Sequence, residues 1–550
     1  MAQSSKPYQD WDVSVLIAFL TTFLTIVVLS TRLITGNGSI ESAGLEKGSR
    51  PPMLPYWFPF IGHLSNFLYD PEALLNQARN VFPSGIFALK LGKYRHNVVY
   101  SPGLIQNLLS QLKSNKDTQD MRSTVMINVF GMDSKYAGTY FQIKPNLARA
   151  ISPHLEFTSG TNERFDDLLK RLQGNLPDLV TFNPSMVDQE PWERLGFVTP
   201  SEDGNEAEAS LLPLTQIFLT QMTLDTLFTP SILSDSDRMD FAPLLLALTQ
   251  SHALLLTGLP RTLPHPSLPT AHLTRKRLLN HIDALHDILT DEEIQGPLLA
   301  DRQVILEKNE IPPQVQDADL LSLIWGVTNP LLLAFWMLVH IISDQTLHVH
   351  ILNEITPYVQ AIQEAPVLGF TVPPRVNIEV ASLISNCGLL KAAYIETVRL
   401  YSRGLVTLKS AADFSIEEST SKVFGKKEKW GIKKGEYVSV PFWLANTDPA
   451  TFTRPEEWDA DRHLDTDEEG NDIGLQGNVL DNCGSFGLPA AKEMCERTCL
   501  AFVAGVLVLY EFEPKDKTGW KIPKAEFAAG VALPKGDFRV KIKRSELRAK

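Results

Sequence analysis

Four cysteines are the side chains in this chain that could bind a metal ion or act as nucleophiles: Cys387, Cys483, Cys495 and Cys499. They include no C-x-x-C pair, so the spacing does not favour a disulfide framework. We therefore expect any cysteine with a chemical role to act singly, as one ligand or one nucleophile in a reducing compartment. Cys495 and Cys499 are four residues apart, which is equally typical of two small apolar residues on the core-facing side of a helix.

Glu396 and Arg399 are separated by one helical turn, so their side chains can meet on one face of a helix. An E-x-x-R pair by itself is most often a surface ion pair. Here the neighbouring positions, among them Leu390, Ala393 and Val398, are apolar, which predicts that the pair is at least partly buried. A third charge, Arg462, follows downstream.

The order of these segments resembles the C-terminal half of a cytochrome P450. The Glu396–Arg399 helix is followed by a strand-rich segment, then by a string ending in Arg462-His463, and then by a loop with a cysteine. The resemblance covers roughly residues 50 to 545. It implies that Glu396, Arg399 and Arg462 form a structural network beneath a haem and take no part in catalysis.

The apolar helix expected over residues 317–343 contains Thr328-Asn329-Pro330 near its centre. A proline inside a helix removes a backbone hydrogen bond and produces a kink. Most P450s carry an acid followed by an alcohol here, and these deliver protons to bound dioxygen. The asparagine, followed by Phe335-Trp336, resembles the branch with sterol 7-hydroxylases and prostacyclin synthase. By this resemblance Asn329 and Thr328 are the candidate catalytic residues, although Asn329 could equally be a core amide at the kink.

The resemblance also implies a haem whose iron is held by a cysteine thiolate just before the last long helix. When the tail of that helix sets the register, the ligand position falls on Pro489, which cannot bind iron. When insertions are allowed, Cys495 becomes the ligand, and Lys492, three residues earlier, would meet a haem propionate. Cys483 is a third candidate. A haem held by Cys495 and a chain without thiolate-bound haem are both left open.

Residues 13–32 contain an uncharged apolar run that is just long enough to span a bilayer, bordered by Trp11 and Arg32. A cleaved signal peptide is the alternative. However, the apolar run is longer than the hydrophobic region of a usual signal peptide, and Asp10 and Asp12 are acidic where a signal peptide carries basic residues. Basic residues after the run favour a cytoplasmic body. The sequence therefore predicts a single-pass membrane anchor.

The remaining segments predict one large, mainly helical body. The proline-rich residues 50–63 predict a stiff extended hinge, and residues 64–545 the catalytic domain. Helical spacing of apolar residues indicates a helix over 278–289, and strand patterns occur near 85–101 and 406–441. We expect the acidic stretch 198–208 to be a solvated loop. Residues 530–542 favour a terminal hairpin, with which the P450 family also ends.

Composition narrows the classes of function. The net charge of −13 excludes nucleic acid as a bulk partner. No phosphate-binding loop or nucleophile elbow is present, so kinase and hydrolase functions find no support.

The expected fold is that of a cytochrome P450, mainly α with a small β-rich subdomain and one N-terminal transmembrane helix. By resemblance to fungal members, we expect an enzyme of the endoplasmic reticulum membrane that oxidises a lipophilic small molecule, such as a terpenoid or polyketide, for a specialised metabolite. It would use haem and NADPH-cytochrome P450 reductase. The alternative is a P450-derived enzyme without haem–thiolate ligation that catalyses a non-oxidative cyclisation, rearrangement or isomerisation.

Overall fold

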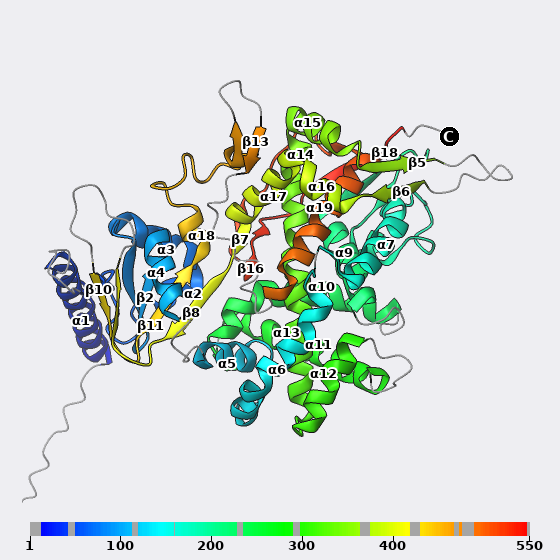
Figure 1. The fold of residues 1–550 in the computed structure, drawn as a ribbon. Helices are drawn as coiled ribbons and strands as arrows, with labels where there is room; N and C mark the ends of the chain where they lie inside the picture. Colours follow the sequence, from blue (N-terminus) through cyan, green and yellow to red (C-terminus); the bar gives the residue numbers. More distant parts are fainter. Residues whose placement is uncertain are drawn as a thin grey trace, which may run out of the picture. The chain divides into compact units, whose positions relative to one another are not determined.

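The structure is a computed structural model that describes residues 13–41, 50–112, 119–158, 160–227, 235–263, 265–289, 297–363, 374–417, 429–466, 472–475 and 489–546. The chain divides into two compact units, residues 1–118 with 407–440, and residues 119–406 with 441–550. Helices predominate and the sheets are small, so the predicted fold class is confirmed (Figure 1).

The first unit combines a long N-terminal helix with a small sheet. Its helices are α1 (Val13–Glu41), α2 (Leu64–Tyr69), α3 (Pro71–Val81) and α4 (Pro102–Leu112). Its strands are β1 (Ile86–Leu91), β2 (Tyr94–Val99), β8 (Leu405–Lys409), β9 (Phe414–Glu417), β10 (Lys429–Ile432) and β11 (Tyr437–Pro441). Strands β1, β2, β11 and β8 form one sheet in that order, and β9 pairs with β10. The predicted strand segments are therefore present.

The β1–β2 hairpin shows how local sequence fixes this sheet. Leu91 pairs with Tyr94, which leaves a two-residue turn. Gly92 occupies the first turn position with φ of +60°, a conformation that favours glycine. The proline-rich segment 50–63 contains no helix, and its Leu54 N–H donates to the Ala88 carbonyl of β1 at 2.9 Å.

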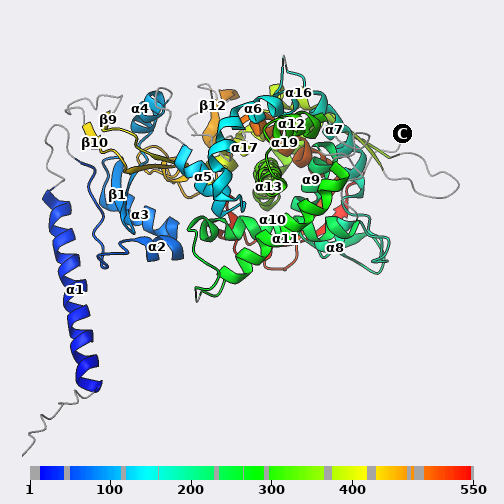
Figure 2. The same cartoon turned by 90° about the horizontal axis from the view of Figure 1, so that it is seen from below.

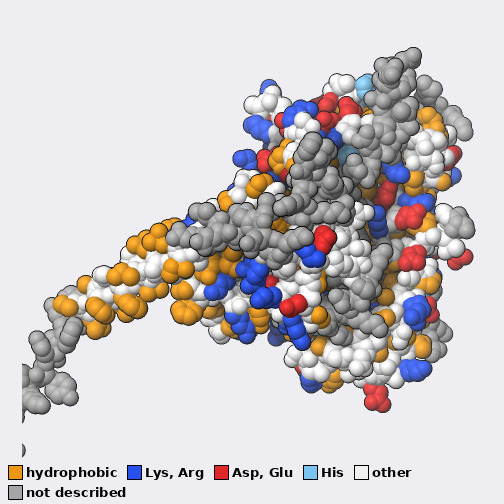
Figure 3. All heavy atoms as spheres, turned by 60° about the vertical axis from the view of Figure 1, so that its left-hand side comes forward, with side chains coloured by type: hydrophobic (Ala, Val, Ile, Leu, Met, Phe, Trp, Pro, Cys, Tyr) orange, Lys and Arg blue, Asp and Glu red, His pale blue; other side chains and the backbone are white. Residues whose placement is uncertain are grey.

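Helix α1 contains the candidate membrane span, residues Val15–Gly36, none of which is buried within the protein. Hydrophobic side chains cover this helix in Figure 3. Its C-terminal half is tied to the following segment: the Thr35 hydroxyl donates to the Tyr56 carbonyl at 3.2 Å, and Arg32 lies over the Trp57 ring at 5.2 Å. Two other described helices are also long and apolar enough to cross a membrane, Met239–Leu256 and Pro313–Ser343. The second of them is 94% buried, as expected for a core helix.

The second unit contains most of the helices. They are α5 (Gln119–Asn128), α6 (Ala137–Leu155), α7 (Glu163–Asn175), α8 (Pro191–Leu195), α9 (Leu211–Leu227), α10 (Asp235–Leu256), α11 (Leu268–Leu289), α12 (Pro297–Lys308), α13 (Pro313–Thr328), α14 (Leu332–Ser343), α15 (Gln345–Ile355), α16 (Val380–Asn386), α17 (Gly388–Tyr401), α18 (Phe442–Asn446) and α19 (Lys492–Leu509), with 3-10 turns η1 (Ser134–Tyr136), η2 (Leu176–Asp178), η3 (Asn329–Leu331), η4 (Ala460–His463) and η6 (Pro489–Ala491). The helix predicted over 278–289 is the second half of α11, with Leu278 and Ile282 fully buried.

A long interrupted helix, made of α13, η3 and α14, runs through the core of this unit. Figure 2 looks almost along the axis of α13 and shows other helices of the unit around it. The interruption occurs at Asn329–Leu331, where Pro330 cannot donate a backbone hydrogen bond. The predicted kink is therefore present, and it brings Thr328 and Asn329 to the point where the helix changes its geometry.

The strands of the second unit are short. They are β3 (Thr199–Pro200), β4 (Glu206–Ser210), β5 (Val359–Ile362), β6 (Arg375–Ile378), β7 (Ser402–Arg403), β12 (Leu464–Thr466), β13 (Asp472–Leu475), β14 (Tyr510–Pro514), β15 (Ala525–Glu526), β16 (Gly530–Val531), β17 (Leu533–Pro534) and β18 (Arg539–Arg544). The largest sheet has the order β14-β18-β4-β3, and the others pair β15 with β17, β16 with β7, β5 with β6, and β12 with β13.

One expectation about these strands was partly wrong and another was wrong. The acidic stretch 198–208 is a loop only at 201–205, where Glu202 and Asp203 are exposed, because the residues on either side form β3 and β4. There the carboxylate of Glu208 meets Lys515 at 2.8 Å and Arg539 at 2.5 Å, which removes the electrostatic reason for a loop. Residues 530–542 do not pair with each other as a hairpin, since β16, β17 and β18 each pair with a strand from elsewhere.

Candidate functional site

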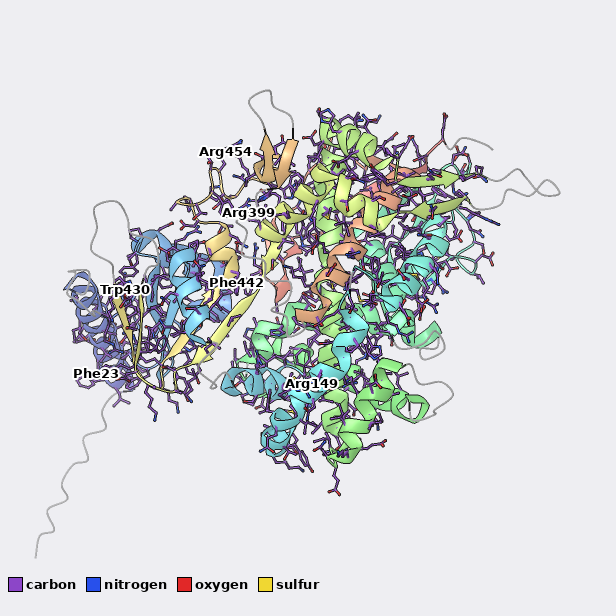
Figure 4. All side chains as sticks on the ribbon, viewed as in Figure 1. Phe23, Arg149, Arg399, Trp430, Phe442 and Arg454 are labelled. Carbon is purple, nitrogen blue, oxygen red and sulfur yellow. The ribbon has the colours of Figure 1, made fainter. Side chains whose placement is uncertain are left out.

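The predicted charge network is assembled around the carboxylate of Glu396 on α17. Arg399 binds it with two hydrogen bonds, Nε to Oε2 at 2.7 Å and Nη2 to Oε1 at 2.8 Å. Arg462 Nε lies 3.3 Å from Oε1. Glu396 and Arg399 are both fully buried, and Figure 4 labels Arg399 on α17. The structure therefore brings together all three residues assigned to the network.

The network has a fourth side chain that sequence reasoning missed. His463 Nε2 donates to Glu396 Oε2 at 2.8 Å, and the Asp459 backbone N–H donates to Oε1 at 3.0 Å. The remaining donors of Arg399 bind backbone carbonyls, including that of Asn446 at 2.8 Å. The position of His463 beside Arg462 was the only sequence signal for it. The Glu396 carboxylate thus accepts hydrogen bonds from three side chains and one backbone N–H.

These hydrogen bonds determine the charge of Glu396. Burial alone would raise its pKa, but the hydrogen bonds from Arg399 and His463 outweigh it and lower the pKa to about 2. The lowered pKa means that the ionised carboxylate stabilises the fold at neutral pH. Since Glu396 and Arg399 are fully buried and hydrogen-bonded to each other and to neighbouring groups, their arrangement suits a structural role.

Acid should weaken this network in a defined pH window. A carboxyl whose pKa falls from 4.5 to about 2 on folding contributes stability above pH 4.5 and loses it as the pH drops toward 2. The expected loss is about 3 kcal/mol of unfolding free energy. Urea unfolding of the full chain in detergent, followed by tryptophan fluorescence at several pH values, measures it. An equal loss of stability in Glu396→Gln over the same window would assign the effect to other groups.

The candidate catalytic residues Thr328 and Asn329 are both buried at the interruption of the core helix. The Thr328 hydroxyl donates to the Ile324 carbonyl of its own helix at 2.8 Å. The Thr328 hydroxyl proton is therefore already donated to a backbone carbonyl. Asn329 instead reaches across to other elements.

The amide of Asn329 has a defined orientation. Its Nδ2 donates to the Thr249 hydroxyl of α10 at 3.3 Å and to the Ala529 carbonyl at 3.3 Å. Rotating the amide by half a turn would place Oδ1 against the Ala529 carbonyl, which repels it. In the present orientation the buried Oδ1 has no hydrogen-bond partner among the described residues. An unsatisfied buried acceptor of this kind is a natural place for a donor from a ligand or a water molecule.

Aromatic side chains lie beside this acceptor. Trp325 is one helical turn before Asn329, and its indole N–H donates to the same Thr249 hydroxyl at 3.0 Å. His252 stacks on Trp325 with ring centroids 5.2 Å apart, and Phe130 meets Trp325 edge-on at 6.0 Å. Thr249, His252 and Phe130 were missed from the sequence. Helix α10, which carries the first two, and the bend after α5, which carries Phe130, meet the interrupted helix only in the folded chain. Trp325 and Phe130 thus place apolar surface near the buried Asn329 amide.

The candidate haem ligand Cys495 lies in the first turn of α19 and is 3% exposed. Its thiol donates to the Val327 carbonyl of α13, with sulfur and oxygen 3.6 Å apart. Burial raises the pKa of Cys495 to about 12 and that of Cys499 well above its usual value. Both side chains are thus protonated thiols in this structure. Lys492, the candidate propionate partner, is exposed at the start of the same helix.

This geometry does not fit Cys495 as a haem ligand. If Cys495 held a haem, its sulfur would have to be a thiolate and would need the space of a flat ring beside it. A flat ring needs about 3.5–4.0 Å to the nearest atoms on each of its faces. The sulfur already lies 3.6 Å from the Val327 carbonyl of α13, which leaves no room for a ring between them. Cys483 and the preceding loop lie outside the described residues, and in the described part of the chain no group of three or more His, Cys, Asp or Glu could hold a metal ion.

Comparison with known proteins supports the resemblance to cytochrome P450. No protein-family model matches the chain. A curated relative, the cytochrome P450 monooxygenase poxD of Penicillium oxalicum, is 23% identical over 483 residues, which cover 86% of this chain and 90% of that protein. The similarity extends over most of both chains, and the mainly helical fold with small sheets agrees with it. This similarity supports the interpretation of the chain as a divergent relative of the cytochrome P450 family.

Proposed function

We propose that this chain is a membrane-anchored monooxygenase of the P450 type that oxidises a lipophilic small molecule, such as a terpenoid or polyketide, in the biosynthesis of a specialised metabolite. The observation that carries the proposal is the similarity over most of both chains to a relative named as a monooxygenase. The exposed apolar helix Val15–Gly36 supports a single-pass anchor in the endoplasmic reticulum membrane with a cytoplasmic body. If haem is bound, its electrons would come from NADPH-cytochrome P450 reductase.

Within this proposal the described residues bind and orient the substrate. Trp325 and Phe130 supply apolar surface next to the interruption of the core helix, and Asn329 Oδ1 accepts one hydrogen bond from the ligand. Thr249 and the Ala529 carbonyl hold the Asn329 amide in the orientation that presents Oδ1. A single directional contact beside this apolar surface fixes which end of a lipophilic molecule faces the interrupted helix.

A second candidate function has its own supporting observation. The thiol of Cys495 donates to Val327 and has a strongly raised pKa, which suits a chain without haem–thiolate ligation. Such an enzyme would hold one conformer of its substrate for a non-oxidative cyclisation, rearrangement or isomerisation. Orientation by itself can supply a large part of the rate enhancement in reactions of this type.

A carbon monoxide difference spectrum separates the two candidates. For the oxidative function we expect purified, reduced full-length protein in detergent to show the Soret band of a thiolate-bound haem. Cys483→Ala, Cys495→Ala and Cys499→Ala then identify the ligand, with the buried Cys499 as the matched control. Protein that stays colourless after haem supplementation and still converts a substrate would overturn the monooxygenase in favour of the second candidate.

A further inference from the structure

Four aromatic side chains form a continuous row in the second unit. Trp336 of α14 stacks on Tyr401 at the end of α17, with ring centroids 3.9 Å apart and planes 8° from parallel. The Tyr401 hydroxyl lies 2.6 Å from Nε2 of His340. His340 in turn stacks on Trp458, with centroids 4.5 Å apart and planes 5° from parallel. Each member therefore contacts the next either face to face or through a short hydrogen bond.

The row leads from the interior toward the surface. Trp336 is fully buried, Tyr401 and His340 are nearly so, and Trp458 is partly exposed. Both indoles are fixed, because Trp336 Nε1 donates to the Ala532 carbonyl at 2.8 Å and Trp458 Nε1 donates to the Thr397 hydroxyl at 3.1 Å. Ala532 is three residues from Ala529, the residue whose carbonyl holds Asn329. Trp336, the inner end of the row, thus contacts the same short segment as Asn329, the polar residue of the candidate site.

The chemistry of the row is suited to moving single electrons. Tryptophan and tyrosine are the side chains most readily oxidised by one electron, and tyrosine must lose its proton when this happens. Burial lowers the pKa of His340 to about 3 and raises that of Tyr401, so both are neutral at rest. The imidazole is then a weak base, but an oxidised tyrosine is a strong enough acid to give its proton to the Nε2 lone pair at 2.6 Å. The ionised Glu396 nearby favours the imidazolium that would result. Packing alone would require neither the 2.6 Å hydrogen bond nor the graded exposure.

We propose that Trp336, Tyr401, His340 and Trp458 form an electron-transfer relay that carries an oxidising equivalent from the candidate site to the surface. The biological role of this relay rests on the proposed monooxygenase function, because only an oxidising enzyme would need it. The oxidant would be an alkoxyl radical of the lipophilic ligand, which leaves as the alcohol after gaining one electron and one proton. The electron comes through the row from a thiolate in solution, which becomes a thiyl radical. The proton comes from water, and the hydroxide left behind is neutralised by the proton that the thiol released when it ionised.

Within the protein, electrons move along the row and one proton moves between Tyr401 and His340. Tyr401 loses an electron through Trp336, and its phenol proton moves to His340 Nε2. Trp458 then passes an electron to the Tyr401 radical, which takes its proton back from His340. The indole radical cation of Trp458, at the surface, is reduced by the thiolate. No side chain of the row is consumed, so one turnover protects the interior from one radical.

Light-driven oxidation of the full-length protein tests the relay without substrate or haem. A ruthenium polypyridine photosensitiser attached to Glu456→Cys, two residues from Trp458, is oxidised by a flash in the presence of a sacrificial acceptor. We expect a tyrosyl radical by electron paramagnetic resonance and by its transient absorption. The same label on Glu307→Cys of α12 is the matched control, because that exposed position is not adjacent to the row.

The variants decide between a relay and simple packing. Tyr401→Phe keeps the stacked ring and should abolish the radical, whereas Trp458→Phe and His340→Leu should slow its formation to the rate seen with the control label. A radical of unchanged yield in Tyr401→Phe, or of unchanged rate in the partly exposed Trp458→Phe, would overturn the relay. Radical transfer in protein that stays colourless after haem supplementation would overturn the monooxygenase proposal and leave the relay standing.

Discussion

Replacing Glu396 by glutamine should lower the free energy of unfolding by about 3–5 kcal/mol, because it leaves a buried guanidinium without its counter-charge. Arg399 is fully buried and has no route to water. Its other donors already bind backbone carbonyls, so the network has no second carboxylate to take over. Urea unfolding of the full-length protein in detergent, followed by tryptophan fluorescence, measures the change.

An exposed ion pair of the same unit provides the control. Glu457 binds Arg454 at 2.8 Å, and the two side chains are 60% and 63% exposed. Glu457→Gln makes the same chemical change in water, where such a pair contributes about 0–1 kcal/mol. We expect a large loss for Glu396 and almost none for Glu457. Equal losses would mean that burial does not set the strength of the network.

The network could be predicted because it depends on short-range spacing. Glu396 and Arg399 occupy one face of one helix, and the apolar residues around them in the sequence are enough to indicate burial. Arg462 was identified by resemblance, and its backbone segment does return to α17. His463 was missed because a lone histidine carries no sequence pattern, and only the turn η4 directs it toward the carboxylate.

Pairing between distant strands could not be predicted. The acidic residues near 206 are typical of a loop when they are considered alone. In the fold they face Lys541 and Lys543 of β18, more than 300 residues later, so the charges stabilise a sheet. The hairpin expected at 530–542 failed for the same reason: each of its strands finds a partner outside the segment.

Whether Cys495 could be a haem ligand depends on where helix α19 begins. Spacing made Cys495 a candidate ligand as long as it preceded the helix, where backbone amides could stabilise a thiolate. The structure starts α19 at Lys492, so Cys495 lies inside the first turn and its thiol points at Val327. A difference of one turn in the helix start thus separates a metal ligand from a packing residue, and the sequence does not resolve one turn.

Replacing Asn329 by leucine should abolish the preference for ligands that carry a hydrogen-bond donor. In the wild type an alcohol can donate to Oδ1, whereas a ketone with the same carbon skeleton presents an oxygen that Oδ1 repels. The buried acceptor should therefore favour the alcohol by roughly tenfold in affinity, since satisfying such a group is worth about 1–3 kcal/mol. Leucine keeps a similar volume, retains the apolar surface and offers no acceptor.

Pairs of terpenoid alcohols and ketones, titrated while the fluorescence of Trp325 and its neighbours is recorded, measure this ratio without any need for turnover. Thr328→Val is the matched control, because that hydroxyl is used by its own helix and should leave the ratio unchanged. The ratio should approach one in Asn329→Leu, with both ligands still bound through apolar contacts. If instead Asn329→Leu keeps the wild-type ratio, or Thr328→Val removes it, the polar anchor of this site lies on a different residue, and the orientation of the Asn329 amide serves only to join α10 to the interrupted helix.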